Sequence, residues 1–318
     1  MAGPAMTAWR ERTIDVDGPV HVVEYGGTPG PTFVCVHGLG GSALDWQALA
    51  PRLIPHGRVV ALDLPGSGDS PLRGRSASVA AHQQVLDRYL TADVGEPVVL
   101  MGNSMGGMVA ILQAATRPRT VERLVLLSPV LPASVRRMPH PLVTAQFCAY
   151  AVPQVGEWYI RSRRRYAGDQ RLVDISLAFL TVHPERIARE VYEQRYALSA
   201  RLAAAADGDR AFLTAARSLL ALLAAPGRYQ RLIAAVAVPT LVVHGARDRL
   251  VNAAAARRLV GFRTDWQVHI LNDVGHMPQL EAPDDVAHLL ARWQADSVPR
   301  SANSAGPWAS GNARGPRR

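Results

Sequence analysis

Lysine is absent from the 318-residue sequence, so all 35 basic side chains are arginines. The formal net charge is +9, and a basic balance can indicate a protein that binds nucleic acid or an anionic membrane. Here the arginines are spread along the chain and alanine is abundant, which indicates a coding bias rather than a binding surface. We therefore expect no nucleic-acid partner. The one local concentration is either a solvated face or a site that attracts an anionic substrate, and it comprises Arg161 and Arg163–Arg165.

Cysteine and long apolar runs are also scarce. Cys35 lies in the apolar run Thr32–Val36, and Cys148 lies far from it in the sequence. Two isolated cysteines in a chain of this size are typical of reduced, packed thiols rather than of a disulfide framework.

No uncharged apolar stretch reaches the length of about 18 residues that a transmembrane helix needs, and the residues MAGPAMTAWRER lack the apolar core of a signal peptide. The sequence therefore predicts a cytoplasmic protein without stable membrane insertion.

Short apolar runs alternate with helical patterns in two parts of the chain. The predicted strands are Arg12–Val16, Val20–Tyr25, Thr32–Val36, Arg58–Leu62, Pro97–Met101, Leu124–Leu127, Thr240–Val243 and Gln267–Leu271. The predicted helices are Trp46–Leu53, Ser78–Leu90, Met105–Thr116, Ala253–Val260 and Pro283–Ala295. Alternation of this kind predicts an α/β fold with a mostly parallel central sheet and helices on both faces.

The segment between these two parts has no strand pattern. From Leu131 to Leu232 it contains helical stretches rich in Ala, Leu and Arg and punctuated by prolines, which predicts a helical cap inserted over one edge of the sheet. We therefore expect a core of residues 1–130 and 236–296, a cap of residues 131–235 and a disordered tail of residues 297–318. Within the cap, Ala211–Ala225 is a buried helix, an apolar pocket wall or a membrane-facing lid.

The strongest motif is Gly102-Asn103-Ser104-Met105-Gly106, directly after an apolar strand and directly before a helical pattern. A nucleophilic serine needs a sharp, strained turn, and glycines two residues to either side let the neighbouring chain pass without a Cβ clash. The helix that follows points its free N–H groups at the same place. Ser104 is therefore the predicted nucleophile, and the alternative is a turn of purely structural use.

This motif resembles the α/β-hydrolase family of serine hydrolases, and the resemblance covers roughly residues 12–296. It implies the α/β-hydrolase fold and the chain order nucleophile, acid, histidine. After the predicted strand 239–245, the run HGARDRLV matches the family's H-G-x-x-D-x-x-V pattern and assigns the acid to Asp248. The run VGHMP looks like the family's histidine loop and assigns the base to His276. The resemblance thus implies a triad of Ser104, Asp248 and His276.

Asp63 is the main rival for the acid. It lies in the run LDLPGSGDS, which resembles the family's D-x-P-G-x-G-x-S loop, a motif that usually shapes the backbone. Among the ten histidines, His37 and His244 each precede a glycine at a strand end, where a loop-shaping role is the more common one. The remaining histidines are interpreted as surface or core residues, and they are His21, His56, His82, His140, His183, His269 and His288.

Acyl transfer also needs two backbone N–H donors for the oxyanion. The resemblance assigns one donor to Met105, which follows the nucleophile, and the other to Leu39 in the loop HGLGGS after the strand Thr32–Val36. The alternative for this loop is a plain Gly-rich turn.

Together these residues predict a serine hydrolase that cleaves a carboxylic ester of a small or medium, lipophilic substrate. Two other reactions stay open: acyl transfer, and C–C hydrolysis as in meta-cleavage hydrolases. The GNSMGG run resembles the latter, although their histidine is typically followed by Trp, where Met277 stands here. A ligand receptor without turnover is a further alternative, which an intact triad disfavours. We expect a small-molecule substrate, no cofactor and no metal, and the sequence leaves a homodimer open.

Overall fold

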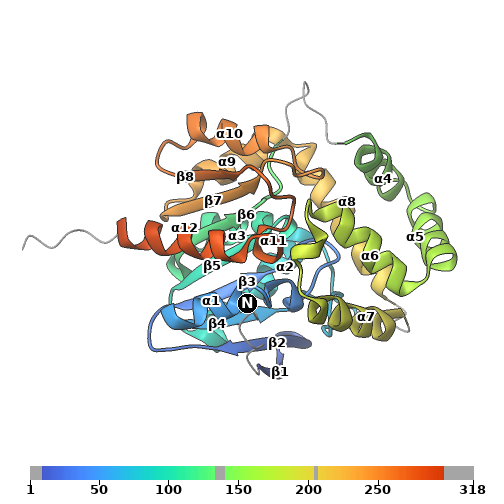
Figure 1. Ribbon diagram of the computed structural model, residues 1–318, viewed down its shortest axis with the longest axis horizontal. Coiled ribbons are helices and arrows are strands. Elements are labelled where there is room, and N and C mark those ends of the chain that lie inside the picture. The colour runs from blue at the N-terminus through green and yellow to red at the C-terminus, as the bar shows by residue number, and fades with distance from the viewer. Residues whose placement is uncertain (1–8, 133–139, 204–206, 297–318) are drawn as a thin grey trace, which may run out of the picture.

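The computed structural model describes residues 9–132, 140–203 and 207–296. Its centre is one eight-stranded sheet with the order β1-β2-β4-β3-β5-β6-β7-β8 (Figure 1). The pairs β1–β2 and β2–β4 are antiparallel, and the other neighbouring pairs are parallel. The strands are β1 Arg10–Asp15, β2 Pro19–Gly26, β3 Thr32–Val36, β4 Arg58–Leu62, β5 Val98–Asn103, β6 Val121–Leu127, β7 Thr240–Gly245 and β8 Gln267–Leu271.

The predicted fold class is confirmed, and all eight expected strands form with ends shifted by no more than three residues. One expected helix is wrong. Residues Trp46–Leu53 do not form one helix but a 3₁₀ turn, Ala43–Trp46, followed by the short helix α1, Ala50–Leu53. Pro51 explains the break, because proline has no N–H to donate to Gln47 and is tolerated only in the first turn of a helix.

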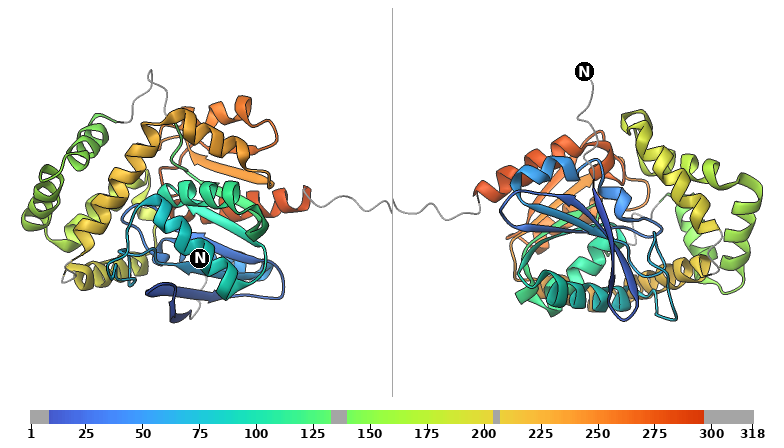
Figure 2. Two further views of the ribbon diagram at one scale, coloured as in Figure 1. Left: turned by 180° about the vertical axis from the view of Figure 1, so that it is seen from behind. Right: turned by 90° about the horizontal axis from the view of Figure 1, so that it is seen from below.

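Helices cover both faces of the sheet because successive side chains of a strand point to opposite faces. Val34 and Val36 of β3 pack with α2 Val79–Tyr89, α3 Met105–Thr116, α9 Pro226–Ala235 and α10 Ala253–Phe262. Phe33 and Cys35 pack with α1 and with α12 Pro283–Asp296. The right-hand view of Figure 2 shows α1 and α12 on one side of the sheet and α2 and α3 on the other. Burial on both faces explains why the central strands are continuous apolar runs.

An arch of helices leaves the sheet after β6 and returns at β7, at the right of Figure 1. The arch consists of α4 Pro141–Ala151, α5 Val155–Ala167, α6 Asp169–Leu180, α7 Arg189–Ala203 and α8 Gly208–Leu223. No strand occurs among the described residues of this insert, as expected. In contrast, α9 belongs to the layer on the sheet, since the hydroxyl of its Tyr229 donates to the Val130 carbonyl at 2.7 Å. We therefore propose that the cap comprises α4–α8.

Three further expectations concern the thiols, the tail and the membrane. Cys35 is buried as expected, whereas Cys148 is exposed on α4, so the expectation of a packed thiol is wrong for Cys148. Both cysteines are free. The tail of residues 297–318 lies outside the described residues. Across the described segments, the structure contains no helix that is long and apolar enough to cross a membrane.

Candidate active site

Ser104 lies in the turn between β5 and α3 with φ +55° and ψ −118°, a backbone conformation that a residue with a side chain rarely adopts. An added Cβ on Gly102 would lie 2.5 Å from the Gly106 carbonyl oxygen, and one on Gly106 would lie 2.2 Å from the Val36 carbonyl oxygen. Gly102 is therefore required where β5 passes close to the first turn of α3, and Gly106 where α3 passes the end of β3. Strain of this kind is typical of functional positions.

Hydrogen bonds hold the serine turn against its neighbours. The amide of Ser104 donates to the Leu127 carbonyl at 3.1 Å, which ties the turn to the end of β6. The side-chain amide of Asn103 donates to the same carbonyl at 3.0 Å and to the His276 carbonyl at 3.2 Å. Asn103 thus joins the serine turn to the histidine loop, a role that sequence reasoning missed because the residue fills a variable position of the motif.

His276 is buried in the loop between β8 and the short helix α11, Pro278–Glu281. Its Nδ1 lies 2.7 Å from Oδ2 of Asp248, whose side chain is fully buried. The other oxygen of Asp248 accepts the backbone N–H groups of Leu250 at 2.8 Å and Val251 at 2.9 Å. An ionised Asp248 makes Nδ1 of His276 the proton-bearing nitrogen and leaves Nε2 as an acceptor.

Asp248 stays ionised in spite of its burial. Burial by itself raises the pKa of this carboxyl, but the electrostatic attraction of His276 and the hydrogen bonds of His244 and His276 lower the pKa below its usual value. His244 is itself fully buried, with its Nε2 3.3 Å from Oδ2 of Asp248 and 2.9 Å from the Val251 carbonyl oxygen. Sequence reasoning gave His244 only a loop-shaping role, and the structure adds this direct contact with the acid.

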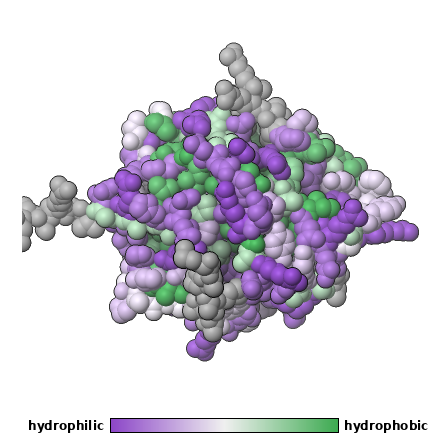
Figure 3. All heavy atoms as spheres, viewed as in Figure 1, coloured by the Kyte–Doolittle hydropathy of each residue, from purple (hydrophilic) through white to green (hydrophobic). Residues whose placement is uncertain are grey.

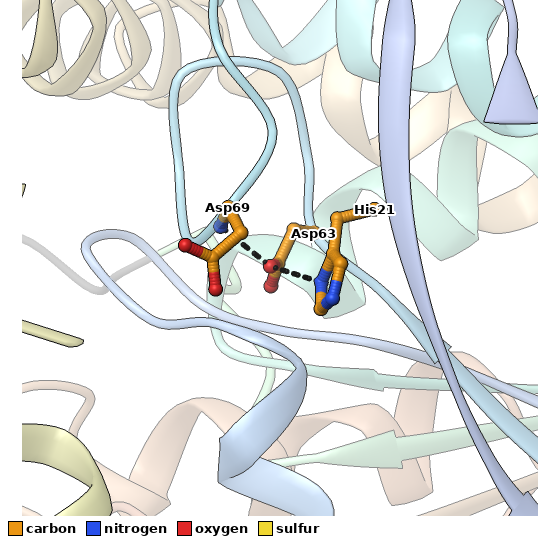
Figure 4. Close-up of side chains that lie close together, drawn as sticks. All are labelled: His21, Asp63 and Asp69. Atoms are coloured by element: carbon orange, nitrogen blue, oxygen red, sulfur yellow. Dashed lines mark hydrogen bonds and ion pairs between the residues drawn. The ribbon is translucent and has the colours of Figure 1, made fainter. Parts of the chain in front are cut away.

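Asp63, the rival acid, lies among different partners (Figure 4). Its carboxylate accepts the backbone N–H groups of Ala43 at 2.6 Å and Asp69 at 2.8 Å, and it lies 2.9 Å from Nδ1 of His21. The hydrogen bond with Asp63 raises the pKa of His21. Asp63 therefore fastens loops together on the β2–β4 side of the sheet.

The same three side chains could be considered as metal ligands, because His21, Asp63 and Asp69 place one ligand atom each within 4.8 Å of one another. The hydrogen bonds already engage both oxygens of Asp63, and the Arg201 guanidinium pairs with Asp69 at 2.7 Å. Hydrogen bonding and charge pairing account for this cluster, so we assign it a structural role.

The expected oxyanion loop is held by a buried histidine. Nε2 of His37 accepts the amide of Leu64 at 3.0 Å, which leaves Nδ1 to donate to the Gly38 carbonyl at 2.7 Å. An added Cβ on Gly38 would lie 3.1 Å from Cβ of Ser104, so this loop passes directly beside the serine. Within the described chain, the amide of Leu39 donates to no other group. The amide of Met105 opens α3 and has no intrahelical acceptor.

Glu281 links the histidine loop to the cap, and no sequence motif indicated it. One oxygen of this buried carboxylate accepts the amides of Val182 at 2.7 Å and His183 at 2.8 Å, and the other accepts the amide of Gly275 at 2.7 Å. The amide of His276 also donates to the Leu180 carbonyl at 2.6 Å. The connection that follows α6 is therefore fastened to the loop that carries the histidine.

A buried ion pair makes the second link between cap and core. Arg195 of α7 lies 2.5 Å from Asp45, in the turn that follows the expected oxyanion loop, and both side chains are largely buried. Nearby, Met277 and Leu280 of the core pack against Leu177, Ile187 and Val191 of the cap segment. The cap thus contacts the site region from two sides.

Comparisons with known proteins agree with this architecture. The profile of the alpha/beta hydrolase family matches residues 33–289. The chain is 30% identical over 273 residues to a pimeloyl-[acyl-carrier protein] methyl ester esterase of Xanthomonas axonopodis pv. citri, which covers 85% of this chain and 97% of the relative. It is 28% identical over 267 residues to an enzyme of the same name from Aromatoleum aromaticum, and the match covers 82% of this chain and 96% of the relative.

A solved structure extends the likeness to three dimensions. The serine hydrolase CCSP0084 from the polyaromatic hydrocarbon-degrading bacterium Cycloclasticus zankles superposes with a TM-score of 0.72 at 18% identity, over 92% of this chain and 100% of that chain. At this identity the likeness shows the fold alone. The family profile covers most of the chain and spans every expected site residue from Leu39 to His276. This chain is therefore a hydrolase that belongs to the alpha/beta hydrolase family.

Proposed function

We propose that the chain is a serine esterase that cleaves a carboxylic ester through an acyl-enzyme, with Ser104 as nucleophile, His276 as base and Asp248 as the acid that orients the base. One observation carries the proposal. A serine with strained φ of +55° is tied through Asn103 to the loop of a buried histidine, and Nδ1 of that histidine lies 2.7 Å from a buried carboxylate. This is the arrangement that nucleophilic acyl transfer requires.

The reaction follows from these roles. Oγ of Ser104 attacks the ester carbonyl carbon while Nε2 of His276 takes the hydroxyl proton, and the carbonyl oxygen becomes an oxyanion. The amides of Leu39 and Met105 donate to this oxyanion, and each contributes on the order of 3 kcal/mol to transition-state binding. The C–O bond to the alcohol then breaks, and His276 returns the proton to the alcohol. Water repeats the sequence on the acyl-enzyme and releases the acid.

The substrate side of the proposal rests on the cap. An added Cβ on Gly40 would lie 3.0 Å from the ring of Phe212 on α8, so an aromatic side chain of the cap lies on the expected oxyanion loop. Phe212 packs edge-on against Tyr150 of α4 at 5.2 Å between ring centroids. Apolar rings at this place support a small or medium, lipophilic substrate. Two relatives named as methyl ester esterases support ester cleavage in particular.

The test is a panel of p-nitrophenyl esters of rising acyl length, run beside labelling by a fluorophosphonate. We expect turnover and labelling of the wild type, and neither in Ser104→Ala. Turnover of a meta-cleavage product in preference to every ester would move the assignment to C–C hydrolysis. Product formed with an added alcohol acceptor in preference to water would move it to acyl transfer. Absence of both labelling and turnover would favour a receptor.

A further inference from the structure

Exposed apolar side chains concentrate on one part of the cap. The described residues expose eight large apolar side chains, and six of these lie in the segment of α4–α6. The six are Leu142, Val152, Val155, Trp158, Tyr166 and Ile175. The other two, Val260 and Phe262, lie on α10, next to the sheet. Single exposed apolar residues need no explanation, but a cluster of this kind is typical of an interaction surface.

Helix α5 carries the centre of this cluster on one face. Trp158 is 63% exposed and Tyr166 is 83% exposed, and Arg161 and Arg165 follow Trp158 at helical spacings of three and seven. The opposite face of α5 contacts the rest of the cap, because Arg164 pairs with Asp209 of α8 at 3.1 Å. The outward face of α5 therefore combines two large aromatic side chains with two arginines, and we call these four residues the α5 face.

A pocket of about 460 Å³ lies beside the α5 face, between α5 and α6. This pocket is open to solvent, because the lining side chains Trp158 and Tyr166 are themselves largely exposed. Its lining is apolar apart from Ser162 and Arg163, and it comprises Trp158, Tyr159, Ser162, Arg163, Tyr166, Ala167, Leu172 and Ile175. Such a pocket can accept an aliphatic chain next to a cation.

The charge on this part of the cap is net positive. Helices α5 and α6 carry five arginines, Arg161, Arg163, Arg164, Arg165 and Arg171, and three acidic residues, Glu157, Asp169 and Asp174. Arg161 and Arg165 make no hydrogen bond or ion pair with the part of the chain that the structure describes. Among the nearby acidic side chains, Glu157 pairs with Arg217 at 3.0 Å and Asp209 with Arg164 at 3.1 Å. Asp174 accepts the Tyr196 hydroxyl, and neither Asp174 nor Asp169 pairs with an arginine of the described residues. Apolar and hydrophilic residues lie next to one another over the cap at the right of Figure 3. A second copy would bring the same arginines together across a two-fold axis, which disfavours self-association through this face.

We propose that the α5 face and the α5–α6 pocket are a docking surface for an anionic phospholipid bilayer. Trp158 and Tyr166 lie at the boundary between headgroups and acyl chains, where such side chains are enriched, and Arg161 and Arg165 contact lipid phosphates. The binding is peripheral, along the bilayer surface rather than across it. Docking to the bilayer does not depend on the proposed esterase function. The purpose that we assign to it, access to a lipophilic ester in the bilayer, rests on that function.

The docking surface is connected to the expected oxyanion loop by packed rings. Tyr159 lines the pocket and contacts Tyr150 at 5.8 Å between centroids. Tyr150 contacts Phe212 at 5.2 Å, and Phe212 lies on Gly40. The bilayer surface and the oxyanion loop thus lie at the two ends of one aromatic cluster.

The test measures co-sedimentation with vesicles of phosphatidylglycerol and phosphatidylcholine, and with vesicles of phosphatidylcholine alone. We expect the wild type to bind the anionic vesicles at least tenfold more tightly and to lose this preference at high salt. The double variant Trp158→Ser with Tyr166→Ser should weaken binding to the anionic vesicles more than tenfold. The double variant Arg161→Gln with Arg165→Gln should weaken binding roughly twenty-five-fold, since each basic residue near the surface contributes about fivefold.

A matched control and an inactive variant make the outcome decisive. The double variant Val260→Ser with Phe262→Ser removes the exposed apolar pair of α10 and should bind like the wild type. Ser104→Ala should also bind like the wild type, so a failure of docking and a failure of the esterase proposal are distinguishable. All surface variants should keep wild-type turnover of p-nitrophenyl acetate. The proposal is overturned if anionic vesicles are not bound, if the α10 control loses binding equally, or if the Trp158 and Tyr166 variant instead changes the sedimentation coefficient of an oligomer.

Discussion

The sheet and the cap handle large apolar side chains in opposite ways. In β3, β5 and β7 every residue is buried, because helices cover both faces. In α4–α6 of the cap, six large apolar side chains face outward. The sheet and its loops thus form a closely packed frame for the expected triad, and the cap carries the proposed docking surface. Substitutions in the frame should therefore act on the chemical step, and substitutions in the cap on substrate choice.

The largest effect is expected at the nucleophile and base. Ser104→Ala or His276→Ala should lower kcat by roughly four to six orders of magnitude while the fold survives. Because triad members act as a unit, the double variant should be little worse than either single one. Steady-state kinetics with a p-nitrophenyl ester, beside a circular dichroism spectrum, check this. Activity above a tenth of wild type in Ser104→Ala would show that another residue is the nucleophile.

Comparing variants of two buried aspartates in the frame tests which carboxylate is the acid of the expected triad. Asp248→Asn should leave the fold intact and lower the rate about ten-thousandfold, because it loses the correct histidine tautomer and the charge that stabilises the imidazolium. Asp63→Asn is the matched control, since Asp63 is equally buried but contacts His21 and two loop amides. It should act mainly on the free energy of unfolding, measured in urea. Reversed results would transfer the role to Asp63.

Much of the frame could be predicted from the sequence because its signals are local. A short β-branched run such as Thr32–Val36 and a glycine-spaced serine each carry their meaning within a few residues. The sequence did not predict where the 3₁₀ turn ends and α1 begins. The break arises because Pro51 has no N–H for the hydrogen bond that a continuous helix would need there. Glu281 and Arg195 escaped notice for a different reason. Their partners are 98 and 150 residues away in the sequence, and only folding brings them together.

The contacts of the cap helices were harder to predict from the sequence, because these helices pack against the sheet core on one face and against other cap helices on another. Ala211–Ala225 reads as apolar on most faces, yet in α8 Leu219 packs with the core on the sheet while Leu213 packs with Tyr150 of the cap. The sequence leaves the α5 arginines open, as a solvated face or a site that attracts an anionic substrate. Their place beside Trp158 and Tyr166 became visible only when the structure showed which face of α5 is exposed.

Glu281 tests the link between frame and cap. In Glu281→Gln one acceptor oxygen becomes an NH₂ group, which leaves at least one of three buried backbone N–H groups without its partner. We expect a loss of about 1–3 kcal/mol in the free energy of unfolding, and a lower kcat because the histidine loop loses its fastening. Glu185→Gln, an exposed change on the same connection, should leave both quantities near the wild-type values. An equal loss in both variants would show that Glu281 has no special part in holding the loop.

The cap should decide chain length through Phe212. Each methylene that packs against an apolar wall contributes roughly 0.8 kcal/mol, so Phe212→Ala should shift the ester preference by a factor of a few per methylene, with little change in the rate on acetate esters. Leu219→Ala is the matched control, because Leu219 packs with the core and should affect stability instead. The ester panel measures both. A chain-length profile unmoved by Phe212→Ala would place specificity in the loops around Leu39 and Met277.

The smallest effect concerns the pH dependence of stability at the β2–β4 side of the frame. The hydrogen bond with Asp63 raises the pKa of His21 above its usual value near 6.5. A histidine whose pKa is raised on folding binds its proton more tightly in the native state, so its stabilising contribution is complete below pH 6.5 and is lost as the pH rises through the raised pKa. Urea unfolding from pH 5.5 to 8.5 should therefore show a fall in stability that His21→Asn lacks, with a size of about 1 kcal/mol, as for one hydrogen bond. The ester rate should be the same in both proteins at each pH, because His21 contacts Asp63 and not the expected triad. A parallel pH dependence of the two unfolding free energies would mean that His21 binds no extra proton in the folded protein, and Asp63 would then hold its loops through the backbone amides alone.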